Sequence, residues 1–140
     1  LILQEGQAKA GVLEALDLIE AQGLKIGLAT SSPFTMVEAV LGKLGIRDRF
    51  MAVHSAEVER FGKPHPDVYI HAAEKLGVEP VHCLAIEDSF TGLLAAKAAS
   101  MKALIVPDPA LVGDPRLAIA DHQLHSLAEL DADMLARWVA

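Results

Sequence analysis

The chain has 140 residues, of which 52% are hydrophobic and 22% are charged, and its formal net charge is −7. This composition predicts one globular domain with a substantial apolar core. The acidic balance excludes a surface that binds nucleic acid or anionic lipids by bulk attraction, so we expect any phosphorylated ligand to be held by a few local groups.

The cysteine usage and the length of the apolar runs indicate the cellular setting. Cys83 is the single cysteine, which rules out an internal disulfide and favours a reducing, cytoplasmic setting. Its apolar neighbours predict a thiol packed in the core. Lys97 and Lys102 interrupt the longest apolar run, so no segment reaches the roughly 20 apolar residues that a membrane span needs, and we expect no membrane partner.

The first half of the chain predicts alternating helices and strands. Apolar residues recur at helical spacing in residues 9–22, and Gly23 ends that helix before the apolar strand LKIGLAT. We expect Ser32 to be the N-cap and Pro33 the first residue of a second helix, which Gly45 closes. The run FMAVHSA then predicts a second buried strand, and a polar loop follows it.

The second half continues the alternation. Pro66 opens a helix that Gly77 ends, and VHCLAI is a third strand. Ser89 is the expected cap of the helix FTGLLAAKAAS, after which KALIV predicts a fourth strand and DHQLH a weak fifth. Ser126 and Glu129 stand at capping-box spacing, which predicts that an amphipathic helix closes the chain.

Apolar strands that alternate with helices predict an α/β fold with a parallel sheet and helices on both faces. Strands of this kind are apolar throughout because both of their faces are buried. Ligands of such sheets bind at the carboxyl ends of the strands. Three expected strand ends carry polar groups, in the strings LATSSP, FGKPHP and IEDS. We expect these three loops to converge along one edge of the sheet.

The polar groups at these strand ends also have structural explanations. The Thr-Ser-Ser run is typical of helix capping, and a loop lysine such as Lys63 is usually solvated. Asp88 has the structural alternatives of a cap or an ion pair with Lys63 or Lys97. Two adjacent carboxylates, Glu87 and Asp88, at the mouth of a buried strand nevertheless favour a hard divalent cation such as Mg²⁺. Together with the hydroxyls and the lysine, they indicate a phosphate site.

Three strings resemble a known family. KIGLATSSP, FGKPHPDVY and AIEDSFTGLLAAKAA are similar, in order and approximate spacing, to the second, third and fourth motifs of haloacid dehalogenase-like (HAD) phosphohydrolases, in the branch of beta-phosphoglucomutases and sugar-phosphate phosphatases. The resemblance covers nearly the whole chain. It implies a three-layer Rossmann-like core and a Mg²⁺-dependent phosphohydrolase. The expected substrate is a small phosphorylated metabolite such as a sugar phosphate, and the expected intermediate is an aspartyl phosphate.

The resemblance also implies a role for each motif residue. Thr30 would hydrogen-bond the transferring phosphoryl group, and Ser31 would help through its backbone. Lys63 would neutralise charge on the phosphate oxygens and on the nucleophile. Asp88 would ligate Mg²⁺ directly, while Glu87 would bind it through a water or steady the site. These roles suit phosphoryl transfer, which depends mainly on positioning and charge compensation.

The family's first motif, Asp-x-Asp-x-(Thr/Val), has no match before residue 30. That motif supplies the nucleophile and the general acid and base, and the helical cap that follows it in this branch is also unmatched. Asp17 lies in a helical pattern, where we expect a solvated helix face. We therefore expect residues 1–140 to be the C-terminal part of a HAD-like catalytic core and to be inactive alone.

The unmatched motif has a structural consequence. In the family, the strand that bears the nucleophile lies between the first and third strands predicted above, so the sheet is expected to have a gap there. We expect a missing N-terminal segment or another chain to cover the exposed sheet edges.

Other functions are open on the same residues. A non-catalytic HAD-like domain that binds magnesium and phosphate is the main alternative, and a phosphomutase of the beta-phosphoglucomutase type is another. A phosphoacceptor receiver domain has its acidic pair before the Thr and Lys, whereas here the pair comes last. A histidine metal site is not expected, because the spacing of the six histidines matches no tight zinc pattern. They are His54, His65, His71, His82, His122 and His125.

Overall fold

The computed structural model describes residues 3–4, 7–8 and 11–139. Its α-helices are α1 (Val12–Ala21), α2 (Phe34–Leu44), α3 (Asp67–Leu76), α4 (Phe90–Ala98) and α5 (Ala132–Val139). Its strands are β1 (Leu3–Gln4), β2 (Gln7–Ala8), β3 (Gly27–Thr30), β4 (Ala52–Ser55), β5 (Leu84–Glu87), β6 (Lys102–Ile105) and β7 (His122–Gln123). The five predicted strands correspond to β3–β7, so the order of helices and strands expected from the sequence is confirmed, and β1 and β2 precede it as a short antiparallel pair.

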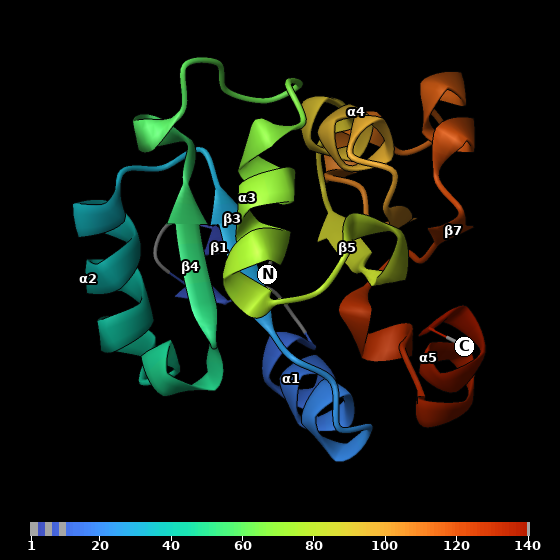
Figure 1. The fold of residues 1–140 in the computed structure, drawn as a ribbon. Helices are drawn as coiled ribbons and strands as arrows, with labels where there is room; N and C mark the ends of the chain where they lie inside the picture. Colours follow the sequence, from blue (N-terminus) through green and yellow to red (C-terminus); the bar gives the residue numbers. More distant parts are fainter. Residues whose placement is uncertain (1–2, 5–6, 9–10, 140) are drawn as a thin grey trace.

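The parallel strands form two separate ladders. β3 pairs with β4, and Thr30 lies opposite Ser55 at their carboxyl ends. β5 pairs with β6, which in turn pairs with β7. Within the described part of the chain, no ladder joins β3 to β5, although Figure 1 shows them as the inner strands of the two halves. The gap predicted between these two strands is therefore present.

Apolar side chains cover both faces of the strands. On β6, Leu104 belongs to a core cluster built with α1 and α2, whereas Ala103 and Ile105 belong to a second cluster built with α3 and α4. Successive side chains of a strand point to opposite faces, so the two clusters lie on the two sides of the sheet. The predicted three-layer α/β architecture is confirmed, and α3 packs on β3 and β4 (Figure 1).

Local sequence signals begin or end several helices as predicted. Gly45 follows α2 and Gly77 follows α3, both in the left-handed backbone conformation that glycine adopts without steric cost. Ser89 caps α4, because its side chain accepts a hydrogen bond from the backbone N–H of Gly92 at 3.1 Å. These signals act within one helical turn, so the sequence alone reveals them.

The predicted cap of α2 is wrong. Pro33 is the N-cap and has no side-chain cap bond, while the carbonyl of Ser32 accepts a hydrogen bond from Ser55 Oγ at 2.6 Å. The first turn is satisfied from another element: the backbone N–H of Phe34 donates to Glu57 Oε2 at 3.1 Å. A distant carboxylate thus replaces the local hydroxyl.

The closing helix is divided in two. The capping box of Ser126 and Glu129 forms, but it caps a short 3-10 helix over residues 127–129. The chain then becomes extended at Leu130, whose side chain is buried, and α5 begins only afterwards. Asp131 caps α5 by accepting a backbone N–H from its first turn at 2.9 Å. Burial of the apolar side chain interrupts the predicted continuous helix.

None of the helices described here is long and apolar enough to cross a membrane.

Two helical glycines make a matched test of this packing. A Cβ atom at Gly92 in α4 would overlap the Glu87 carboxylate, whereas a Cβ at Gly42 in α2 would meet open space. We expect Gly92→Ala to lower the free energy of unfolding by about 1–3 kcal/mol through overpacking. Gly42→Ala should be neutral or raise it by up to about 1 kcal/mol. Urea denaturation measures both, and equal effects would contradict the close packing of α4 on Glu87.

Candidate active site

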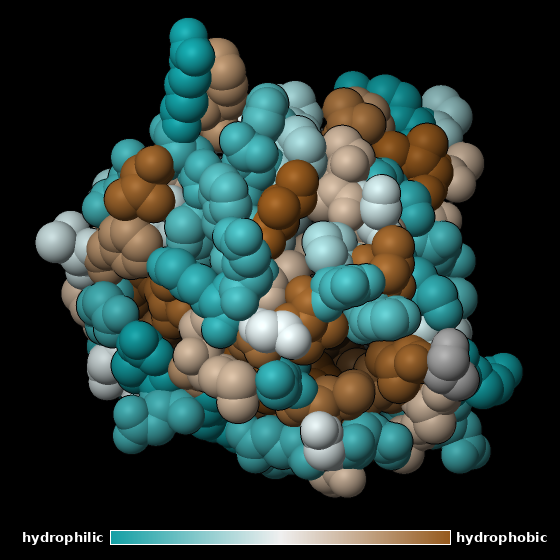
Figure 2. Space-filling view, in the orientation of Figure 1, coloured by the Kyte–Doolittle hydropathy of each residue, from teal (hydrophilic) through white to brown (hydrophobic). Residues whose placement is uncertain are grey.

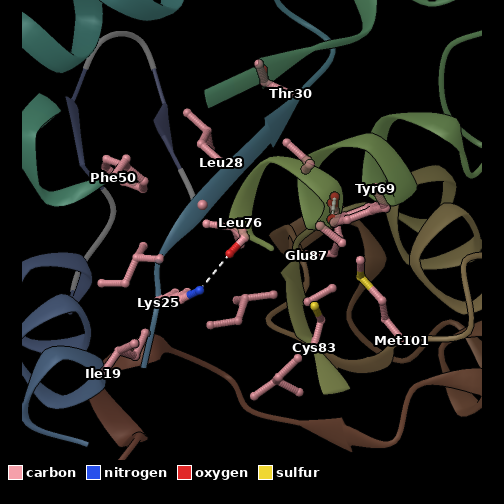
Figure 3. Close-up of a pocket in the computed structure, with 18 of the residues that line it drawn as sticks. Ile19, Lys25, Leu28, Thr30, Phe50, Tyr69, Leu76, Cys83, Glu87 and Met101 are labelled. Atoms are coloured by element: carbon pink, nitrogen blue, oxygen red, sulfur yellow. Dashed lines mark hydrogen bonds between the residues drawn. The ribbon is translucent and has the colours of Figure 1, made fainter. Parts of the chain in front are cut away.

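A cavity of about 830 Å³ lies between β3 and β5. Most of its wall is apolar, with residues from α1, α3, α5 and both strands, and Figure 2 shows a hollow ringed by apolar residues between α1 and α5. One end of the cavity is polar: Figure 3 places Thr30 at the end of β3, while Glu87 lies beside Tyr69. All five residues predicted for the site line this cavity. They are Thr30, Ser31, Lys63, Glu87 and Asp88.

Lys63 links the two halves of the sheet at this polar end. Its Nζ donates to Glu87 Oε1 at the end of β5 (2.6 Å) and to the carbonyl oxygen of Ala29 in β3 (3.3 Å). The side chains of Lys63 and Glu87 are only 12% and 8% exposed. Removing either partner would leave a buried charge uncompensated, so the pair holds the ammonium in one place. The structural alternative of a solvated loop lysine is therefore wrong.

The Glu87 carboxylate is enclosed by protein groups. The hydroxyl of Tyr69 in α3 donates to the same Oε1 atom, and Gly92 lies against the carboxylate. Burial and the charge of Glu87 raise the pKa of Tyr69 well above its usual range, so the phenol stays a hydrogen-bond donor. Of the two roles predicted for Glu87, these contacts favour the one that steadies the site.

Asp88 follows Glu87 at the carboxyl end of β5. Its side chain is half-buried, and its backbone carbonyl accepts a hydrogen bond from the N–H of Asp108 at 3.0 Å. Lys97, one of the partners considered for it, forms an ion pair with Asp121 at 2.7 Å. Asp88 therefore lies where the cavity meets the start of α4, while Ser89 provides the cap of that helix.

The Thr-Ser-Ser turn is held at the same end. Thr30 Oγ1 accepts a hydrogen bond from the backbone N–H of Ser32 at 3.1 Å, and Ser31 is exposed beside it. The hydroxyl of Ser55 ties this turn to β4. The turn does not cap α2, and its three residues line the cavity.

Residues 1–100 match the family model of the haloacid dehalogenase-like hydrolases. The chain belongs to this family. Among curated relatives, hexitol phosphatase B of Escherichia coli K12 is 50% identical over 122 residues, which cover 87% of this chain and 55% of that protein. The chain thus spans about half the length of the curated relatives it matches, and the predicted family resemblance is confirmed.

Solved structures of HAD proteins have the same fold. Beta-phosphoglucomutase from Clostridium difficile superposes with a TM-score of 0.82 at 26% identity, covering 98% of this chain and 58% of the other. CbbY from Rhodobacter sphaeroides, solved in complex with phosphate, gives a TM-score of 0.79 at 30% identity, covering 87% and 55%. The Rossmann-like HAD core is thereby established for this chain.

The position of Cys83 differs from the prediction of a thiol packed in the core. It is half-buried at the start of β5, packs against the core cluster of α3 and α4, and lines the apolar part of the cavity. Burial raises the pKa of its thiol, so it remains protonated and poorly nucleophilic near neutral pH. The thiol is therefore part of the cavity wall and not of the closed core.

Sequence reasoning missed a polar cluster on the other side of the Lys63 loop. Glu59 Oε1 lies 2.5 Å from His54 Nε2 of β4 and 2.6 Å from His71 Nδ1 of α3. The hydrogen bonds from the two imidazoles lower the pKa of Glu59, and the Glu59 carboxylate raises the pKa of His71. No local spacing signals this cluster, because its members come from a strand, a loop and a helix.

The cluster predicts a pH-dependent stability. The ion pair of Glu59 stabilises the fold at pH values above the ordinary pKa of its carboxyl, 4.5. His71 stabilises the fold at pH values below its ordinary pKa of 6.5, and this stabilisation is lost as the pH rises through its raised pKa. His71→Gln should therefore cost most between these values and little near pH 9. The cost should stay below about 1 kcal/mol, because the His71 side chain is 41% exposed.

Thermal or urea unfolding at pH 6 and at pH 9 measures this difference in stability. His125→Gln, which changes an exposed histidine outside the cluster, is the control. An equal cost of His71→Gln at pH 6 and pH 9 would contradict the proposed charge state of the cluster.

Proposed function

We propose that the natural polypeptide containing these residues is a Mg²⁺-dependent phosphohydrolase that acts on a small phosphorylated metabolite, with sugar and hexitol phosphates as the favoured class. One observation carries the proposal: Thr30 at the end of β3, Lys63 in the loop before α3 and Asp88 just after β5 line the same end of one cavity. The identity to hexitol phosphatase B supports the substrate class.

Lys63 is suited to bind a phosphate oxygen. An ammonium has three N–H donors. Glu87 Oε1 and the carbonyl of Ala29 are its two hydrogen-bond acceptors within the described chain, which leaves one donor for a ligand. We assign the phosphoryl group to this donor, to the Thr30 hydroxyl and to the backbone of Ser31. Their charge and dipoles would compensate the negative charge of the transition state.

The residues at the mouth of β5 fit a magnesium ion through Asp88. Mg²⁺ takes oxygen ligands, keeps several waters and is usually held by one or two carboxylates. Asp88 is half-buried and lines the cavity beside Glu87 at the carboxyl end of β5. The Glu87 carboxylate is bonded to Lys63 and Tyr69, which suits a supporting role. We assign direct ligation to Asp88 and the support of Lys63 to Glu87. Bound Mg²⁺ would polarise the phosphoryl group and neutralise part of its charge.

The nucleophile is assigned to a segment outside these residues. Asp17, the early aspartate considered in the sequence, is exposed on α1, as its helical pattern predicted, and it pairs with Arg49 at 2.5 Å. We propose that a strand preceding Leu1 in the natural polypeptide enters the cavity between β3 and β5 and brings an aspartate to its polar end. The apolar walls and the lack of a ladder between β3 and β5 support this placement.

With that aspartate, the reaction has two steps. The carboxylate attacks phosphorus, and the sugar oxygen leaves with a proton from the general acid of the same upstream segment, which gives the sugar alcohol and an aspartyl phosphate. Water then gives a proton back to that group and attacks phosphorus, which releases inorganic phosphate and restores the aspartate. A phosphomutase would instead pass the phosphoryl group to a sugar hydroxyl, and the similarity to the beta-phosphoglucomutase of Clostridium difficile makes it the second candidate. Release of inorganic phosphate distinguishes the two.

Asp88→Asn tests the assigned metal ligand. In the natural polypeptide that includes the residues upstream of Leu1, we expect this change to lower Mg²⁺-dependent hydrolysis of sugar and hexitol phosphates at least about 100-fold, since it removes charge at the reacting group. Asp17→Asn is the matched control on exposed α1 and should leave turnover unchanged. Full turnover by the Asp88 variant would refute the assignment. A detector of released phosphate provides the measurement.

The placement of the nucleophile has its own test. The 140-residue chain alone should hydrolyse a generic phosphate ester at the background rate, while the longer polypeptide should turn it over. Circular dichroism of the 140-residue chain shows whether it is folded under the assay conditions. Hydrolysis by the folded 140-residue chain would show that the attacking group lies within it.

A further inference from the structure

We propose that His54, Glu59 and His71 form a zinc-binding site that clamps the loop carrying Lys63, separate from the assigned phosphate and magnesium site. None of the three residues lines the large cavity. His54 belongs to β4, Glu59 to the loop that follows, and His71 to α3, so one ion would join three elements. The proposal does not depend on the phosphohydrolase activity.

The geometry brings the three donor atoms to one point. A nitrogen of each imidazole and a carboxylate oxygen all lie within 4.8 Å of one another. Ligand atoms bound to one tetrahedral zinc ion at about 2.1 Å stand roughly 3.4 Å apart. The two imidazoles lie closer than this to Glu59 Oε1, at 2.5 and 2.6 Å, because protons bridge them in the metal-free cluster. A side-chain shift of about 1 Å would open the cluster to the ion's bond lengths.

The donor set selects the metal. Two imidazole nitrogens and one carboxylate are a common zinc ligand set, while Mg²⁺ and Ca²⁺ take oxygen ligands almost exclusively. The Glu59 side chain is 6% exposed and that of His54 is also 6% exposed, so two ligands are rigidly enclosed. The His71 side chain is 41% exposed, which provides an entry path and room for a water as the fourth ligand.

The position of the ring proton of His54 limits the affinity of the site for zinc. Its Nδ1 atom is buried and has no hydrogen-bond partner within the described chain, so neutral His54 carries its proton on Nε2, facing Glu59. Zinc bound at Nε2 would displace that proton to Nδ1, where it would find no acceptor within the described chain. An unpaired buried donor is unfavourable. We therefore expect a dissociation constant in the micromolar range and not in the nanomolar range.

Zinc binding would stiffen the segment that positions Lys63. The loop between β4 and α3 holds both Glu59 and Lys63, and the elements that it connects carry His54 and His71. Lys63 is fixed on one side by Glu87, and the clamp would fix the same loop on the other side. Binding energy that is available only to the folded chain raises its stability by mass action.

Zinc and cobalt titrations of the natural full-length polypeptide, after removal of metals with a chelator, test the site. Calorimetry with Zn²⁺ should give one site per chain, and Co²⁺ should give the visible absorption of a four-coordinate ion with nitrogen and oxygen ligands. Millimolar Mg²⁺ should displace neither ion. We expect His71→Gln to weaken Zn²⁺ binding at least about 100-fold, because it removes a ligand. Glu59→Gln should do the same.

His125→Gln and Glu14→Gln are the matched controls, since both change exposed residues outside the cluster, and they should retain the affinity of the unaltered protein. Circular dichroism of the metal-free variants verifies that they are folded. His71 is partly exposed, so its variant is expected to fold even if the Glu59 variant does not. Unchanged Zn²⁺ affinity in His71→Gln, or no binding to the unaltered protein at about 100 μM Zn²⁺, overturns the proposal.

Discussion

The buried ion pair of Lys63 and Glu87 is the contact on which this structure depends. It joins the carboxyl ends of β3 and β5, two parallel strands that share no ladder among the described residues. Burial of two charges is costly, and the attraction between them compensates only when further hydrogen bonds satisfy both groups. Tyr69 and the carbonyl of Ala29 supply those bonds. The pair therefore gives the ammonium a fixed position, and in the function proposed above this position serves to bind a phosphate oxygen.

The same arrangement divides the cavity into two chemically different parts. Its long apolar wall suits an extended segment packed between two strands, and its polar end lies at the strand mouths, where parallel sheets bind ligands. In the function proposed above, the apolar part positions the attacking group, and the polar part binds the phosphoryl group.

Two polar clusters flank the loop between β4 and α3. On one side Lys63 meets Glu87, and on the other His54 and His71 meet Glu59. The loop has little apolar anchorage of its own, since Val58 and Phe61 are exposed. Charged and hydrogen-bonded contacts therefore define its position, so changes at the histidine cluster are expected to reach the site through the placement of Lys63.

The sequence by itself determined the features that act within a helical turn or follow from strand polarity. The glycine ends of α2 and α3, the Ser89 cap and the meeting of Thr30, Lys63 and Asp88 at one edge belong to this class. Tertiary structure alone decided which charged groups pair. Glu57 replaces the expected cap of α2, Glu87 binds Lys63, and Glu59 gathers two histidines. These residues pair because the fold brings them close together, and neither residue spacing nor composition reveals which distant residues will meet.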